Sequence, residues 1–142
     1  MDRMEQANAY HDRGFNCCQS VVAAFSDLTG LGEQESFNIG AGFGAGAGTG
    51  ELCGALSGAV MVLGLLTPVD TADPVGSKQR TLAKSRALQK RFSEKFGALR
   101  CQELLKTRTP AQAETTAARK LGLTNHCAVM IATAVEIVEE ML

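Results

Sequence analysis

The stretch GAGFGAGAGTGELCGALSG, residues 40–58, contains eight glycines and one cysteine in nineteen positions. These glycines occur only at even-numbered positions, so the i, i+2, i+5 spacing of a dinucleotide-binding loop cannot be formed. The other common phosphate-binding loop needs Gly-Lys-Ser/Thr, and no lysine occurs before Pro74. The stretch therefore predicts no nucleotide cofactor and directs attention to Cys53.

Part of the same stretch predicts a helix from about Glu51 to Leu66. Gly50, Gly54 and Gly58 recur at every fourth position and line one side of it, where missing side chains let another backbone approach closely. The other sides carry Leu, Val and Met, so the helix is apolar all round and belongs at the centre of the domain. Residues 40–48 are expected to form a tight turn with close contacts or positive φ angles.

Outside this stretch, composition favours helix over strand. Ala, Leu, Glu, Lys and Gln are abundant and only three prolines occur. We expect an all-α fold, with one domain over residues 1–142 and a bundle of five to six helices around the glycine-rich helix. The main helices are predicted over about 2–13, 17–28, 51–66, 78–96 and 126–141, with shorter ones over 33–42 and 98–106.

Charge and hydropathy argue against several classes of partner. The formal net charge is −1, which gives no long-range attraction to nucleic acid or anionic membranes. The longest apolar run, residues 52–66, is shorter than the ~20 residues that span a bilayer. The N-terminal residues are polar and do not resemble a secretion signal. We therefore expect a cytoplasmic protein without membrane insertion or nucleic acid binding.

Four of the five cysteines share a type of position. Cys17, Cys53, Cys101 and Cys127 each lie near the start of a predicted helix and on its inward side. A helix N-terminus stabilises a thiolate. We expect these four side chains to meet in one redox-active or metal-binding centre. No C-x-x-C occurs, so neither a zinc ribbon, a thioredoxin-type pair nor covalent haem is predicted.

Four segments resemble the C_GCAxxG_C_C family of redox-active proteins: FNCCQSVVAAF, GFGAGAGTGELCGALSGAVMVLGL, FGALRCQELL and HCAVMIATAVEIVEEML. Residues 53–58 match the CGAxxG motif, and Cys17, Cys101 and Cys127 match the family's other cysteines. The resemblance implies an α-helical fold and a redox or metal-cluster role. A related domain in split-Soret cytochromes accompanies haem with an iron–sulfur centre, but the haem motif C-x-x-C-H does not occur here.

Three functions follow as alternatives. In the first, the thiols cycle with a disulfide, as in a thiol-based oxidoreductase; Cys53 attacks, since its glycine-lined approach is the most open, and Cys17, Cys101 or Cys127 resolves the disulfide. In the second, the same four cysteines ligate an iron–sulfur cluster of an electron carrier. In both, the redox partner is unidentified. In the third, the cysteines only pack, and the glycine-lined helix makes a homodimeric assembly or binding module.

Several other residues are candidates for accessory roles. Cys18 follows the first cysteine and is expected to lie beside the centre or to pack in the core. His126 could be a metal ligand or could assist a thiolate, and Glu51 could accept a proton. His11 lies near the end of the first predicted helix, where we expect it to interact with the negative end of the dipole.

Overall fold

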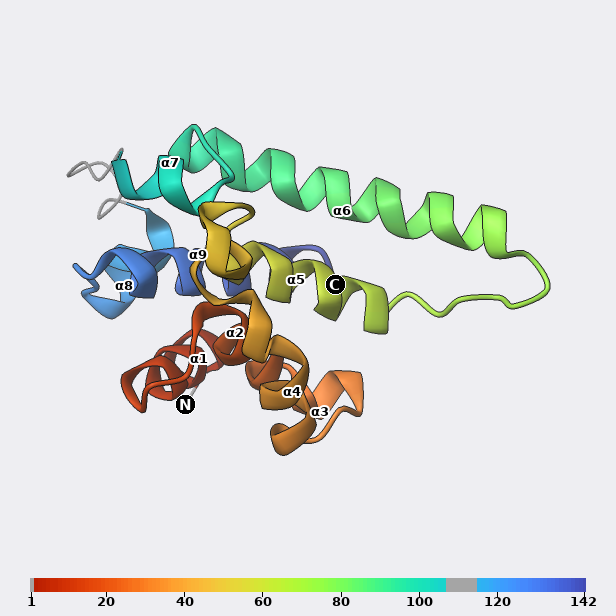
Figure 1. Ribbon diagram of the computed structural model, residues 1–142, viewed down its shortest axis with the longest axis horizontal. Helices are drawn as coiled ribbons and strands as arrows, with labels where there is room; N and C mark the ends of the chain where they lie inside the picture. Colours follow the sequence, from red (N-terminus) through yellow and green to blue (C-terminus); the bar gives the residue numbers. More distant parts are fainter. Residues whose placement is uncertain (1, 107–114) are drawn as a thin grey trace.

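The computed structural model describes residues 2–106 and 115–142, and these parts of the chain fold into α-helices joined by turns and loops (Figure 1). The α-helices there are α1 (Arg3–Asp12), α2 (Cys17–Ala24), α3 (Ser26–Thr29), α4 (Glu33–Gly40), α5 (Gly54–Leu65), α6 (Pro74–Phe96), α7 (Cys101–Lys106), α8 (Thr116–Leu121) and α9 (His126–Glu140). A 3₁₀ turn, η1 (Ala41–Phe43), and a π turn, η2 (Gly46–Gly50), follow α4. No β-strand occurs in these described ranges, so the all-α prediction is confirmed.

The helices are more numerous than predicted, and most are shorter, although α6 begins four residues earlier than expected. The expected helix over 17–28 is interrupted at Phe25, which divides it into α2 and α3, and Leu28 at the end of the predicted range is 44% exposed. The central glycine-rich helix begins at Gly54 instead of Glu51. Helix α8 lies in a polar region for which the sequence predicts no element. These differences raise the count from five or six to nine α-helices in the part of the chain that the structure describes.

Two helices share the centre of the fold. Helix α5 packs against α2, α6 and α9, and most of its residues are buried. Helix α9 packs against α1, α2, α5, α6 and α8, and ten of its fifteen residues are buried. The glycine-rich helix is therefore central as predicted, but α9 contacts more of the other helices.

The glycines of α5 let it lie directly on α2. A Cβ atom at Gly58 would lie 3.0 Å from the Cys18 carbonyl oxygen and 3.1 Å from Val21 Cβ. One turn earlier, a Cβ at Gly54 would lie 2.9 Å from the Phe43 carbonyl oxygen. Contacts this short exclude a side chain, which confirms that the glycines allow close backbone packing. Their partner is α2 of the same chain, so this face is not available to a second copy as the dimer hypothesis required.

The glycine-rich segment before α5 forms the expected tight turn. The backbone has positive φ at Ala45, Gly46, Ala47, Gly48 and Gly50. Glycine adopts this region without steric cost, and alanine is the smallest alternative. At Gly46 the space is also closed, because a Cβ there would lie 2.4 Å from the Glu51 amide nitrogen. Both expected causes, close contact and positive φ, thus operate in this turn.

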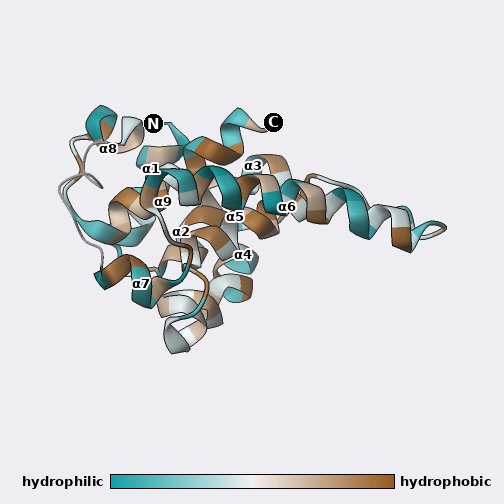
Figure 2. Ribbon diagram, turned by 90° about the horizontal axis from the view of Figure 1, so that it is seen from above, coloured by the Kyte–Doolittle hydropathy of each residue, from teal (hydrophilic) through white to brown (hydrophobic). Residues whose placement is uncertain are grey.

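Helix α6 extends beyond the body of the molecule. Figures 1 and 2 show its N-terminal half projecting with the loop that follows α5, while its C-terminal half lies on the core. There Lys95 pairs with Glu136 and Arg91 with Glu140, both on α9. Among the described residues, no helix is both long and apolar enough to cross a membrane.

We predict that Gly58→Ala destabilises the protein relative to Gly64→Ala. Both substitutions gain the same intrinsic helix propensity, about 0.5–1 kcal/mol. A Cβ at position 64 meets nothing within 4 Å, whereas one at position 58 meets α2. The overpacking should make Gly58→Ala about 1–3 kcal/mol less stable than Gly64→Ala. Urea unfolding followed by circular dichroism measures both free energies, and equal values would contradict the packing argument.

Candidate functional site

All four cysteines predicted to form one centre line a single cavity of about 260 Å³. Cys17 is the first residue of α2, Cys53 precedes α5, Cys101 begins α7 and Cys127 is the second residue of α9. The remaining lining residues are His11, Asn16, Ala45, Gly54, Leu104, Leu105, His126 and Met130. The structure thus gathers four helix starts around one partly enclosed space.

A tight turn between α1 and α2 brings His11 beside Cys17. His11 lies in the last turn of α1, and Gly14, with φ of +103°, reverses the chain immediately afterwards. Asn16 then caps α2: its side chain accepts a hydrogen bond from the Gln19 amide, and the Gln19 side chain accepts one from the Asn16 amide. This capping box fixes the backbone one residue before Cys17.

An isolated antiparallel bridge holds Cys53 beside Cys101. The bridge joins Leu52 to Arg100. The Cys53 amide donates to the Leu99 carbonyl at 2.9 Å, and the Cys101 amide donates to the Glu51 carbonyl at 2.6 Å. These two hydrogen bonds tie the cysteine before α5 to the cysteine that begins α7. Because the bridge joins residues far apart in sequence, no local pattern could have predicted it.

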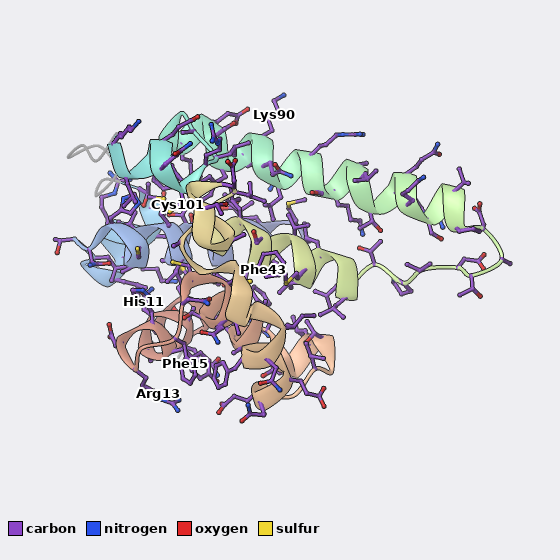
Figure 3. The ribbon with its side chains drawn as sticks, viewed as in Figure 1. His11, Arg13, Phe15, Phe43, Lys90 and Cys101 are labelled. Atoms are coloured by element: carbon purple, nitrogen blue, oxygen red, sulfur yellow. The ribbon has the colours of Figure 1, made fainter. Side chains whose placement is uncertain are left out.

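Cys127 completes a compact group with His11 and Cys17. Asn125 caps α9, its side chain accepting a hydrogen bond from the Ala128 amide, and α9 packs against both α1 and α2. The Cys17 and Cys127 sulfurs and a ring nitrogen of His11 all lie within 4.8 Å of one another. Figure 3 shows His11 and Cys101 at the same end of the molecule.

The electrostatics of this group favour a thiolate on Cys127. A hydrogen bond with Cys17, followed by one with His11, holds the pKa of Cys127 well below the usual thiol range, and the positive charge of His126 adds to the effect. The same hydrogen bond raises the pKa of Cys17, with burial adding to it. The hydrogen bond with Cys127 raises the pKa of His11. The arrangement therefore favours the thiolate form of Cys127, the thiol form of Cys17 and the protonated form of His11.

At Cys53 and Cys101, burial raises the thiol pKa by more than the helix N-terminus lowers it. Burial raises the pKa of Cys53 to about 11, although the amides of Ala55 and Leu56 lower it by hydrogen bonding. Burial also raises the pKa of Cys101. Only 5% of Cys53 is exposed, so the open approach on which its predicted role as attacking thiolate rested is not present. Of the four cysteines that line the cavity, Cys127 is the one whose pKa is lowered.

The three candidate accessory residues lie in three different environments. His126 lines the cavity as expected. Cys18 is fully buried and packs toward Met61, with the two sulfurs 3.9 Å apart, so it lies in the core. Glu51 is exposed and pairs with Arg100 at 3.0 Å, outside the cavity lining, so the structure does not support a role as proton acceptor.

His11 is the site residue for which the sequence predicted another role. In place of a simple interaction with the helix dipole, it hydrogen-bonds with Cys127, 116 positions away. The one sequence feature that indicates a place for His11 near Cys17 is the short Gly-containing turn between them. That feature cannot show that α9, which carries Cys127, lies beside the same turn.

A family model agrees with this arrangement of four cysteines. Residues 15–141 match the model of C_GCAxxG_C_C, whose description is "putative redox-active protein". The chain belongs to this family. No curated protein and no solved structure matches the sequence significantly. Cys17, Cys53, Cys101 and Cys127 lie within the matched residues, whereas His11 precedes them.

We predict that Cys127 is the most reactive thiol at acidic to neutral pH. Its pKa is lowered in the folded protein, so its thiolate persists as the pH falls below about 8.5, where ordinary thiols protonate. Iodoacetamide labelling across pH, followed by peptide mass mapping, should modify Cys127 first. The thiols of Cys53 and Cys18, with pKa values of about 11 and 12, should react only on unfolding.

The matched control is a pair of histidine variants. His11→Gln should slow the labelling of Cys127 at low pH, and His126→Gln should slow it less, because the hydrogen bond from His11 is the stronger influence. Preferential labelling of Cys53 or Cys101 would refute this assignment of the thiolate.

Proposed function

We propose that the protein is a dithiol–disulfide redox protein whose reactive pair is Cys17 and Cys127. The observation that carries the proposal is the approach of their sulfurs to within 4.8 Å of each other and of His11, beside a cavity. Membership of a family described as redox-active supports the same conclusion.

The reaction requires a disulfide as oxidant, on a protein or a small molecule. The Cys127 thiolate attacks one sulfur of that disulfide, forming a mixed disulfide and releasing the first thiolate. Cys17 then loses its proton and attacks the Cys127 sulfur, closing the Cys17–Cys127 disulfide and releasing the second thiolate. The protons of Cys17 and the His11 imidazolium pass to the two released thiolates, so two thiols are oxidised and one disulfide is reduced.

Cys53 and Cys101 form a second, less reactive pair of thiols beside the first. Both line the same cavity, and backbone hydrogen bonds hold their segments together. We assign them the role of a second dithiol, which is oxidised only after the Cys17–Cys127 disulfide has formed. The net capacity is then two dithiols, oxidised in sequence by two equivalents of external disulfide. The redox partner that supplies or removes these electrons is a thiol or disulfide of unidentified origin.

The second candidate is an iron–sulfur cluster held by Cys17, Cys53, Cys101 and Cys127. The observation that favours it is the donor set, since four thiols line one largely apolar cavity and four thiolates are the usual ligands of such clusters. A cluster would supply one-electron transfer in place of dithiol exchange. It would make the protein an electron carrier, with the surrounding helices shielding the centre from water.

We predict that mild oxidation forms one intramolecular Cys17–Cys127 disulfide. Reduced protein treated with oxidised glutathione should lose the mass of two hydrogen atoms, and peptide mapping should recover residues 17 and 127 in one linked fragment. Cys17→Ser should stop at a mixed disulfide on Cys127, and Cys127→Ser should not react. Cys18→Ser serves as the control, because Cys18 lies outside the cavity lining and should leave the product unchanged.

Two outcomes would decide against this function. A first disulfide between Cys53 and Cys101 would reverse the assigned order of the pairs. Protein isolated without oxygen or chelator that is brown and carries iron and sulfide by native mass spectrometry would favour the cluster.

A homodimer or other assembly is a separate proposal. Its support is a set of exposed apolar side chains on and near the projecting part of α6: Leu65, Val69, Val75 and Leu82. Exposed apolar side chains that lie together are typical of interaction surfaces. Sedimentation of Leu82→Glu beside the unmodified protein tests it, since the substitution should lower the mass of a dimer to that of a monomer.

A further inference from the structure

We propose that His11, Cys17 and Cys127 form a mononuclear site for a borderline-soft divalent cation of the zinc class. This site differs from a four-cysteine centre in its ligands and in the number of metal ions. It includes a histidine that precedes the residues matched by the family model, and it does not require Cys53 or Cys101. The inference is independent of whether the dithiol reacts with disulfides.

The distances within the group suit such an ion. Zinc bonds to sulfur at about 2.3 Å and to imidazole nitrogen at about 2.0–2.1 Å, so two ligand atoms of a tetrahedral site lie about 3.5–3.8 Å apart. The three donor atoms already lie within 4.8 Å of one another in the absence of metal. This upper limit exceeds the donor spacing of a zinc site by about 1 Å.

The backbone positions of the three ligands are fixed by different elements. The turn at Gly14 and the capping box at Asn16 set His11 and Cys17, and the Asn125 cap sets the start of α9, where Cys127 lies. Because α1, α2 and α9 all pack against one another, the three ligands cannot separate without disrupting the core. Pre-organised ligands of this kind lower the entropic cost of binding a metal ion.

The choice of ion follows from the donors. Two thiolates and one imidazole are soft or borderline ligands that favour zinc, copper(I) or iron over magnesium and calcium. Three protein ligands would leave a fourth position for another ligand, and the cavity that the three residues line also contains Met130 and His126. An open fourth position is typical of zinc sites that accept an exogenous ligand. A small thiol is the ligand whose chemistry matches this largely apolar cavity.

Metal binding and disulfide formation would exclude each other. Both use the Cys17 and Cys127 sulfurs, and a disulfide leaves neither sulfur as a thiolate for the metal. Zinc would therefore protect the reactive pair from oxidation, and oxidation would release the zinc.

Titration of the reduced protein with Co²⁺, a spectroscopic substitute for Zn²⁺, tests the site. We expect one equivalent to bind with the intense absorption of a tetrahedral thiolate complex, and Zn²⁺ to displace it. Loss of a group that only supports a ligand costs 10- to 100-fold in affinity, so loss of a ligand in His11→Gln should cost about 100-fold or more. Cys18→Ser is the control, because Cys18 lies in the core outside the cavity lining, and this variant should bind as tightly as the unmodified protein.

A second measurement does not depend on any variant. In the unmodified protein, one equivalent of Zn²⁺ should protect Cys17 and Cys127 from alkylation while Cys101 stays as reactive as before. The proposal is overturned if no equivalent binds, or if Cys53→Ser or Cys101→Ser abolishes binding while His11→Gln does not. A protein that binds zinc but forms no Cys17–Cys127 disulfide would refute the dithiol function and leave this site intact.

Discussion

The close packing of α5 on α2 is the constraint on which the rest of the structure depends. It is possible only because Gly54 and Gly58 have no side chains, and the atoms that fill the space belong to the Cys17–Cys18 turn and to Phe43. A Cβ at Gly54 would lie 3.3 Å from Cys17 Cβ. The CGAxxG motif therefore has a steric explanation. Its two glycines hold the start of α2 against the start of α5, which brings Cys17 and Cys53 to one end of the domain.

The same end of the molecule receives two further helix starts by other means. A two-hydrogen-bond bridge brings Cys101 to Cys53, and the packing of α9 on α1 and α2 brings Cys127 to Cys17 and His11. The result is a cavity with two unlike halves. In one, hydrogen bonds with Cys17 and a histidine stabilise a thiolate; in the other, burial keeps the thiols protonated. Similar positions at helix starts thus acquire different chemistry from their neighbours.

The difference between the two halves of the cavity shows that a position at a helix N-terminus does not by itself produce a thiolate. A helix N-terminus favours a thiolate by a modest free energy, whereas removal of a thiolate from water costs more when no partner replaces the water. Cys53 accepts hydrogen bonds from two amides of α5, and its pKa is still raised to about 11. Cys127 differs because a thiol and an imidazole replace its water. Proximity to such partners, and not position in a helix, decides which thiol has a lowered pKa.

The sequence by itself determined the helical class, the glycine-lined face of α5 and the family to which the four cysteines belong, because periodicity, glycine spacing and motifs are local properties. Helix boundaries were less certain, as the break at Phe25 shows, because packing competes with propensity. Tertiary structure alone decided which cysteines meet, which of them ionises, and that His11 joins Cys127 while Glu51 faces Arg100. Those outcomes depend on burial and on contacts between residues up to 116 positions apart, which no local pattern encodes.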